Sequence, residues 1–207
     1  MNKTKNAILS VFDKTNLDVI AKFLIKKNFT LYSTGGTSKY LKKIQIPHIE
    51  ISDYTNQKEI LGGRVKTLHP KIFGGLLGTD SYSHQKELSR EKIVNFDVLV
   101  INLYPFEETV NKTKNFDEII EMIDIGGHSL IRAAVKNFRK TITLLDPLDY
   151  KIFIKNYPKT EAAKKNYAIK AMQKITEYDV AISNWFQGIQ TKEYSLRYGE
   201  NPQQSAI

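Results

Sequence analysis

The stretch "FDVLVINL", residues 96–103, is the clearest buried-strand pattern in this chain of 207 residues. Its unbroken apolar centre predicts a parallel strand covered on both faces, because a strand with one face in water would alternate apolar and polar residues. Four other runs predict further strands, at residues 6–12, 29–33, 48–52 and 140–145.

Helical patterns lie between these runs. Leu17, Ile20, Ala21, Leu24 and Ile25 are apolar at helical spacing. Similar patterns predict helices at residues 37–44, 116–123 and 129–138, and two more between Pro147 and about Gln190. Alternating strands and helices are typical of a parallel sheet. We therefore predict an α/β fold, a parallel sheet with helices on both faces and a helical C-terminal flank.

The composition excludes several classes of site. The chain has no cysteine, so disulfides, thiolate metal sites and a cysteine nucleophile are excluded. Its net charge of +9 comes from lysines spread along the chain, which indicates a solvated surface or a small anionic ligand before nucleic acid. No apolar run approaches the ~20 residues of a membrane span, and no export signal is visible. We expect a cytoplasmic protein that binds neither membrane nor nucleic acid.

Polar residues follow three of the predicted strands, where parallel sheets bind ligands. They are Ser10 and Lys14 in "SVFDKT", the turn "STGGTS" at residues 33–38, and Asn102 with Tyr104 in "NLYPF". A hydroxyl-rich glycine turn that opens a helix offers N–H groups to an anion, although it could equally be a simple cap and turn. It matches neither the P-loop nor the dinucleotide fingerprint, so one phosphate monoester is the better interpretation.

A basic stretch, "GGRVKTLHPKIFGG", fills residues 62–75. Its two glycine pairs are interpreted as hinges that let the backbone approach a ligand, and Lys71 as solvated surface. His69, like His48, has no second ligand at metal-binding spacing, so we expect no metal site.

The segment "DIGG", residues 124–127, joins two predicted helices. A helix start with two glycines can direct N–H groups at an oxyanion, and the carboxylate of Asp124 could take a proton. The alternative is an inter-helix turn with an aspartate cap. Lys136 falls in the following helix, where an exposed lysine is the ordinary interpretation.

Together these motifs, with "IRAAVKN" at residues 131–137, resemble the inosine monophosphate cyclohydrolase domain of the bifunctional purine-biosynthesis proteins, in order and in spacing. The resemblance implies a methylglyoxal-synthase-like fold over residues 1–192. "SLRYGENPQQSA", residues 195–206, resembles the opening of the transformylase half, in which Arg197 and Tyr198 would contact the aminoimidazole ribonucleotide. We expect residues 193–207 to be the start of that half, and no folate-dependent formyl transfer from this chain.

The implied reaction closes 5-formamidoimidazole-4-carboxamide ribonucleotide to inosine monophosphate with loss of water. It implies a purine-pathway ribonucleotide as the ligand, no metal or organic cofactor, and a homodimer in the full-length protein. The residues carried over for the 5′-phosphate are Ser10, Lys14, Ser33, Thr34, Gly35, Gly36, Thr37, Arg64 and Thr67.

The resemblance also implies roles around the reacting groups. Lys66 would stabilise the formyl oxygen, with the N–H groups of Ile125 and Gly126 as co-donors, and Gly127 would bind the substrate beside them. Asp124 would accept the carboxamide proton, and Asn102 would hold the base or the carboxamide. Tyr104 and Lys136 would position the base and protonate the leaving oxygen.

Two alternatives remain within the same fold. A regulatory module that senses a phosphorylated metabolite would need the "STGGT" turn but not the other residues together. A methylglyoxal-synthase-type lyase would need an aspartate in the glycine-rich loop, and residues 62–75 contain no acidic residue.

Overall fold

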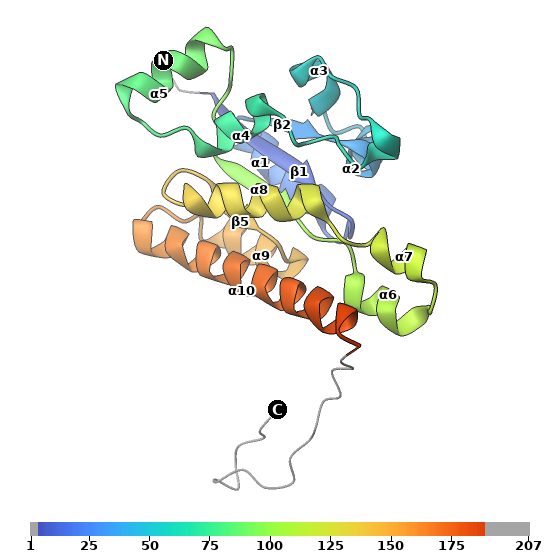
Figure 1. The fold of residues 1–207 in the computed structure, drawn as a ribbon. Helices are drawn as coiled ribbons and strands as arrows, with labels where there is room; N and C mark the ends of the chain where they lie inside the picture. Colours follow the sequence, from blue (N-terminus) through green and yellow to red (C-terminus); the bar gives the residue numbers. More distant parts are fainter. Residues whose placement is uncertain (1–3, 189–207) are drawn as a thin grey trace, which may run out of the picture.

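Five parallel strands form one sheet in the order β3-β2-β1-β4-β5 (Figure 1). The structure, a computed structural model, describes residues 4–188. The strands are β1 (Lys5–Ser10), β2 (Phe29–Ser33), β3 (Ile49–Glu50), β4 (Val98–Ile101) and β5 (Ile142–Leu144). Every neighbouring pair is parallel, as the alternation of strands and helices predicts.

The central strands are buried on both faces. In β1, Ala7 and Leu9 belong to the core cluster on one face of the sheet, and Ile8 belongs to the cluster on the other. In β4, Val100 and Leu99 divide in the same way. Because successive side chains of a strand point to opposite faces, two helical layers must cover the sheet.

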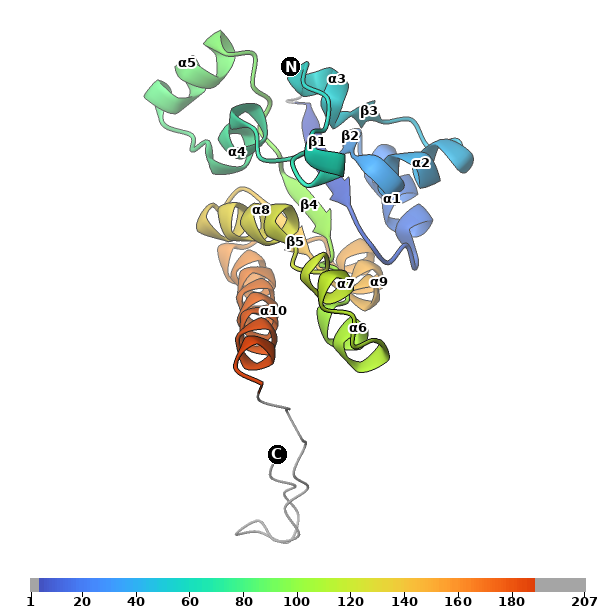
Figure 2. The same cartoon turned by 45° about the vertical axis from the view of Figure 1, so that its right-hand side comes forward.

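Helices cover both faces and confirm the predicted fold class (Figure 2). On the first face, α1, α2 and α9 contribute to the core, and on the second α3, α4, α8 and α10 do so. The helices are α1 (Leu17–Lys26), α2 (Gly35–Lys43), α3 (Ile51–Thr55), η1 (Leu61–Gly63, a 3₁₀ turn), α4 (Pro70–Leu77), α5 (Tyr82–Arg90), α6 (Phe106–Lys112), α7 (Phe116–Ile120), α8 (Ile125–Lys136), α9 (Pro147–Lys155) and α10 (Glu161–Phe186).

The strand predicted at residues 48–52 is largely wrong. Only Ile49 and Glu50 pair with β2, at the edge of the sheet, and Ile51 begins a helix instead. Ile51 is still buried, because the first turn of α3 turns it into the core beside Tyr32. A short apolar run therefore marked burial correctly but not the backbone conformation.

The second glycine pair of the basic stretch is not a hinge. Gly74 and Gly75 lie within α4, where a Cβ atom on Gly75 would stand 2.4 Å from the carbonyl oxygen of Val94. Glycine is required there because the helix packs against backbone. The first pair differs, since Gly62 and Gly63 have φ values of 65° and 94°, which glycine adopts without strain.

The helical C-terminal flank is confirmed by α9 and α10, and α10 packs along α8 and β5 (Figure 1). The predicted boundary at residue 192, Arg197 and Tyr198 lie outside the described residues.

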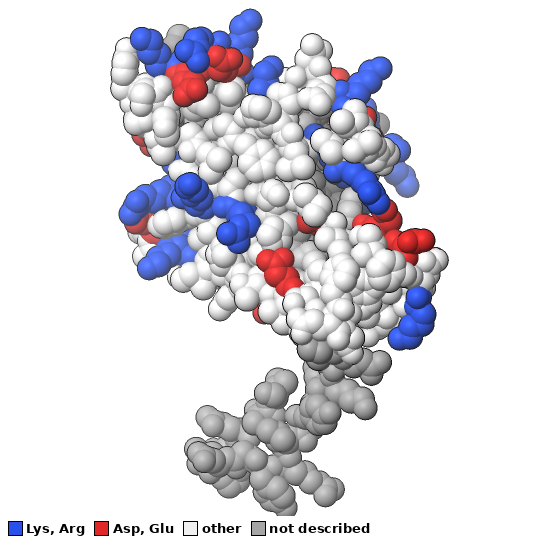
Figure 3. Space-filling model, in the orientation of Figure 1, with Lys and Arg blue, Asp and Glu red and all other residues white. Residues whose placement is uncertain are grey.

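The surface drawn in Figure 3 carries Lys and Arg in several separate groups, with Asp and Glu between them. This face has no continuous basic stripe of the kind that follows a nucleic-acid backbone. Within residues 4–188, none of the helices combines the length and the apolar character needed to cross a bilayer.

Candidate functional site

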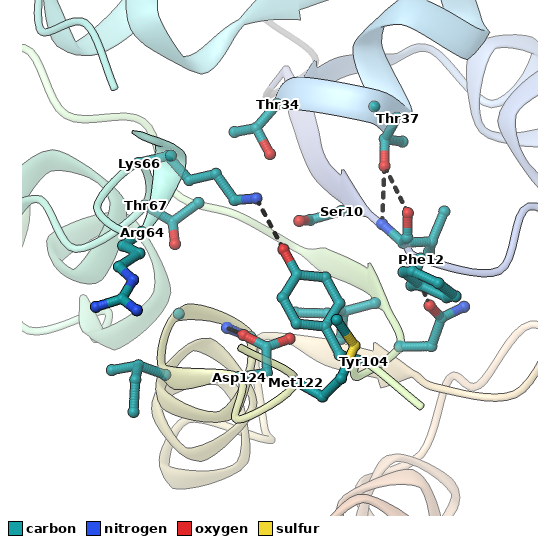
Figure 4. Close-up of a pocket in the computed structure, with 18 of the residues that line it drawn as sticks. Ser10, Phe12, Thr34, Thr37, Arg64, Lys66, Thr67, Tyr104, Met122 and Asp124 are labelled. Carbon is teal, nitrogen blue, oxygen red and sulfur yellow. Dashed lines mark hydrogen bonds between the residues drawn. The ribbon is translucent and has the colours of Figure 1, made fainter. Parts of the chain in front are cut away.

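A cavity of about 790 Å³ opens at the carboxyl ends of β1 and β4. The sheet order reverses between these two strands, and open parallel sheets bind ligands at such a switch point. Its lining comes from five segments, within residues 10–14, 34–37, 59–67, 101–104 and 120–127 (Figure 4). All the predicted site residues in the described part of the chain line this cavity, except Ser33, Gly35 and Lys136.

The N-terminus of α2 makes one side of the cavity cationic. A Cβ atom built on Gly35 would lie 3.9 Å from Nζ of Lys66, and one built on Gly36 would lie 3.9 Å from Nζ of Lys14. The first N–H groups of a helix have no acceptor within the helix and carry a positive partial charge. Two ammonium groups beside such a helix end favour a bound anion such as a phosphate.

Hydroxyl groups of the "STGGTS" turn are divided between structure and cavity. The Ser33 hydroxyl is fully buried and donates to the carbonyl oxygen of Leu9 at 2.8 Å. The Thr37 hydroxyl accepts from the N–H of Val11 and donates to its carbonyl oxygen, both at 2.9 Å. These bonds attach the turn to β1 and occupy both hydroxyls, so the structure does not support Ser33 as a ligand contact. Thr34 lines the cavity without capping α2.

Asn102 holds the loop after β1. Its Oδ1 accepts from the N–H groups of Phe12, at 2.6 Å, and Asp13, at 3.0 Å, and its Nδ2 donates to the carbonyl oxygen of Asp13 at 3.0 Å. The same loop carries Lys14, whose Nζ donates to the carbonyl oxygen of Phe12 at 2.8 Å. Asn102 thus positions Lys14, and its predicted contact with the base would have to use the remaining N–H of its amide.

Lys66 and Tyr104 meet in the centre of the cavity (Figure 4). The Nζ of Lys66 donates to Oη of Tyr104 at 3.3 Å. The ring of Phe12 stands edge-on to the ring of Tyr104, with centroids 5.7 Å apart. An ammonium, a phenol and an aromatic edge therefore face the same space, which suits a planar heterocycle with polar substituents.

Asp124 caps α8, as one of the two interpretations of "DIGG" predicts. Its carboxylate accepts from the N–H of Gly127 at 2.7 Å while it also lines the cavity. Burial raises the pKa of the carboxyl above its ordinary value, and the Gly127 N–H and the charge of Lys66 offset only part of that effect. A partly desolvated carboxylate with a raised pKa is a stronger base than a solvated one.

The two glycines of "DIGG" allow this arrangement. A Cβ atom on Gly127 would lie 2.5 Å from Oδ2 of Asp124, and one on Gly126 would lie 2.9 Å from Oγ1 of Thr67. Side chains at either position would displace the groups they meet. The N–H groups of Ile125 and Gly126, in the first turn of α8, have no acceptor within the helix.

Arg64 and Thr67 line the same cavity as the predicted phosphate-binding residues. Figure 4 shows both on the side from which Lys66 extends, away from Thr37. The exposed guanidinium of Arg64 makes an ion pair with the carboxylate of Glu121, whose hydrogen bond raises the pKa of Arg64. In this structure the charge of Arg64 is therefore paired with Glu121, within the cavity that Lys14 and α2 also line.

Lys136 does not reach the cavity. It is the last residue of α8, eleven residues after Ile125, which is about 16 Å along a helix that rises 1.5 Å per residue. The resemblance placed it beside the leaving oxygen, and the structure does not bring it into the cavity with the other predicted residues.

His69 and Lys71 stabilise the structure beside the site. Nδ1 of His69 accepts from the N–H of Lys71 at 3.1 Å and caps α4. Burial and the nearby charge of Lys71 lower the pKa of His69, which keeps the ring neutral as an acceptor. Lys71 is not merely solvated surface, because its Nζ donates to the carbonyl oxygen of Tyr54 at 3.2 Å.

Several lining residues were not singled out from the sequence. These residues adjoin the motifs in the chain, and most are apolar, so their periodicity alone predicts that they belong to the hydrophobic core. They are Val11, Phe12, Glu59, Ile101, Ile120, Glu121, Met122 and Ile123. Within residues 4–188, no three His, Asp or Glu side chains gather as a metal site requires.

Known proteins match this chain in two segments. The sequence pattern of the family described as "MGS-like domain" matches residues 16–129. The pattern described as "AICARFT/IMPCHase bienzyme" matches residues 134–207.

Curated relatives cover nearly the whole chain. The "Bifunctional purine biosynthesis protein PurH" of Prochlorococcus marinus subsp. pastoris (strain CCMP1986 / NIES-2087 / MED4) is 44% identical over 97% of the chain. The protein of the same name from Staphylococcus aureus (strain Newman) is 45% identical over 98% of the chain. In both cases the chain spans 42% of the length of the relative.

A solved structure confirms the fold. "Crystal structure of ForH" superposes with a TM-score of 0.76 and 28% sequence identity, over 89% of this chain and 100% of that chain.

Proposed function

Because this chain belongs to the MGS-like domain family and resembles the cyclohydrolase part of the bifunctional purine-biosynthesis proteins, we propose that it catalyses a ring closure. The proposed substrate is 5-formamidoimidazole-4-carboxamide ribonucleotide, and the product is inosine monophosphate. The relatives bear the name of purine-biosynthesis proteins, and the pattern that matches residues 134–207 includes the cyclohydrolase in its description.

One observation carries the proposal. A cationic helix end and a group of three catalytic candidates share a single cavity of about 790 Å³. A ribonucleotide phosphate bound at α2 and Lys14 would leave its base among Lys66, Tyr104 and Asp124. The volume is within the range of about 300 to 1,000 Å³ that suits small-molecule ligands.

The first step of the reaction forms the bond between the carboxamide nitrogen and the formyl carbon. An amide nitrogen is a weak nucleophile, so a base must take one of its two protons as the bond forms. Asp124 supports this role, because burial raises its pKa while its contact with the Gly127 N–H fixes its orientation.

The tetrahedral intermediate carries an oxyanion on the former formyl oxygen. The ammonium of Lys66 and the N–H groups of Ile125 and Gly126 are the donors available for that charge, and one such donor contributes about 3 kcal/mol to lowering a barrier. The oxygen then leaves as water. It takes one proton that began on the carboxamide nitrogen and one from the formamide nitrogen, as the carbon–nitrogen double bond forms.

Tyr104 supports the transfer of these protons. Its hydroxyl accepts from Lys66 at 3.3 Å and can in turn donate to the departing oxygen. The base ring would lie against the aromatic pair of Phe12 and Tyr104.

A single assay tests the proposal. The protein is incubated with the formamido ribonucleotide, without folate or added metal, and inosine monophosphate is measured by chromatography. We expect turnover by the parent protein and a loss of at least about 100-fold in kcat for Asp124→Asn, which removes the base. Asp146→Asn is the matched control, because Asp146 caps α9 in the same way and does not line the cavity.

The alternatives give different results in the same assay. Tight binding of the ribonucleotide without turnover would favour a metabolite sensor. Neither binding nor turnover, with a triose phosphate converted instead, would favour a lyase of the same fold.

The wider setting belongs to the proposal as well. We propose a cytoplasmic protein that needs no cofactor for ring closure, binds no nucleic acid, and forms a homodimer in the full-length form. Sedimentation of the full-length protein at several concentrations tests the last point.

A further inference from the structure

Tyr178 reaches the candidate base from the far end of the sequence. It lies in α10, and its hydroxyl accepts from the backbone N–H of Asp124 at 3.0 Å. The same hydroxyl donates to the carbonyl oxygen of Met122. One side-chain oxygen therefore joins the two ends of the turn that leads into α8.

We infer that Tyr178 is a positioning residue for the reaction, one that fixes the turn Met122–Asp124 so that the Asp124 carboxylate faces the ligand. The inference rests on the proposed function, because it gives Asp124 its role as the base.

The bridging hydroxyl pairs two partly buried backbone groups, the N–H of Asp124 and the carbonyl oxygen of Met122. The N–H of Asp124 stands before the first turn of α8, outside the hydrogen bonds of that helix. Partly buried backbone groups that lose a protein partner must pair with water instead, so loss of the hydroxyl would loosen the turn. Asp124 is the residue that this loosening would move.

Tyr178 also packs against the segment that follows β4. Its ring, only 7% exposed, stands edge-on to Phe106 with centroids 6.1 Å apart. Phe106 closes the short turn after β4, since its N–H donates to the carbonyl oxygen of Tyr104 at 2.9 Å. One residue of α10 thus bonds the backbone of Asp124 and packs against Phe106, two residues after Tyr104.

The comparisons put these groups in different matched segments. Asp124 and Tyr104 lie within residues 16–129, which match the MGS-like domain, and Tyr178 lies within residues 134–207, which match the bienzyme pattern. The hydroxyl therefore comes from the segment that the bienzyme pattern adds to the MGS-like part. This arrangement points to Tyr178 as a feature that adapts a general phosphate-binding cavity to ring closure.

A change in Asp124 would be visible in its titration. The groups that influence it are the charges of Lys66 and of His128, which pairs with Asp179, the backbone N–H of Tyr104, which donates to the carboxylate, and the hydroxyl of Tyr178. Burial raises the pKa of Tyr178 to about 12, so the hydroxyl keeps its proton at neutral pH. Tyr178→Phe consequently removes the bridge without altering any charge near the carboxylate.

The experiment compares the parent chain with Tyr178→Phe in two measurements. The first is the pKa of the Asp124 carboxyl without substrate, followed by carbon-13 NMR. We expect it to fall towards the ordinary aspartate value, because a loosened turn lets water reach the carboxylate. The second is the rate of ring closure, in which we expect kcat to fall about 100-fold with KM changed less than three-fold, as a displaced catalytic group would cause.

Tyr167→Phe is the matched control. It removes a phenol hydroxyl from the same helix, eleven residues away and among the core residues of the other face. The control should leave both measurements unchanged, and circular dichroism shows whether each variant is folded.

The outcomes separate the inference from the proposed function. An Asp124 titration in Tyr178→Phe identical to that of the parent overturns the inference, whatever happens to activity. A lowered Asp124 pKa in Tyr178→Phe, together with a parent chain that does not close the ring, supports the positioning role and refutes the proposed reaction. A lowered pKa with kcat unchanged shows that the position of Asp124 does not matter to catalysis, which overturns the inference as well.

Discussion

Replacing Gly127 by alanine tests how tightly the position of Asp124 is set. The new Cβ atom would lie 2.5 Å from Oδ2 of Asp124, whereas ordinary contacts begin at about 3.4 Å. The carboxylate must therefore retreat by about 0.9 Å. A displacement of about 1 Å at a catalytic group costs about 100-fold in rate, so we expect kcat to fall by about that factor.

The same substitution should change stability little. Losing part of the cap on α8 costs about 1 kcal/mol, and alanine in place of glycine within a helix returns about 1 kcal/mol. The expected result is thus an enzyme with parent-like urea unfolding and strongly reduced ring closure. This separation distinguishes displacement of the base from general damage to the fold.

The assay measures kcat and KM for the formamido ribonucleotide alongside urea denaturation. Ser129→Ala is the control, because it places alanine at a partly exposed position of the same helix and removes a hydroxyl that donates to the carbonyl oxygen of Ile125. A Gly127→Ala variant with the same kcat as the parent would refute the reasoning, because the Asp124 carboxylate could then move by nearly 1 Å without any effect on catalysis.

Three further substitutions test neighbouring parts of the site. For Asp124→Asn we expect greater stability than the parent at neutral pH, because the raised pKa of the carboxyl means that folding disfavours its charged form. The difference in stability should disappear as the pH falls below the pKa of the carboxyl. Urea unfolding between pH 4 and 8 measures this, and a difference that grows as the pH falls would contradict it. Asn102→Ala should cost about 1 kcal/mol and raise KM more than it lowers kcat, because it releases the loop that carries Lys14. Glu121→Gln should leave the urea midpoint unchanged, because the ion pair between Glu121 and Arg64 is exposed. The same substitution should lower KM at low salt only. A lower KM that persists at 0.5 M salt would argue against an electrostatic cause.

The fold could be predicted because its central strands are buried on both faces. Apolar runs at β1, β2 and β4 are long enough to be read without ambiguity, and the helices between them repeat at 3.6 residues. The edge strand β3 was overestimated, because Ile51 is buried from a helix and its apolar side chain carries no mark of backbone conformation. Helix α4 was missed, since glycines that serve close packing look like glycines of a loop.

The sequence by itself determined the α/β class, the ends of strands where polar residues gather, and the motifs that carry the family resemblance. These depend on local order: which residue follows a strand, and which opens a helix. The tertiary structure alone decided how each residue is used. It buried the Ser33 hydroxyl against β1, moved Arg64 to Glu121, left Lys136 about 16 Å along its helix, and brought Tyr178 to Asp124. The physical reason is that hydrogen bonds and burial depend on which elements become neighbours, and no local pattern of residues specifies a neighbour 54 positions away.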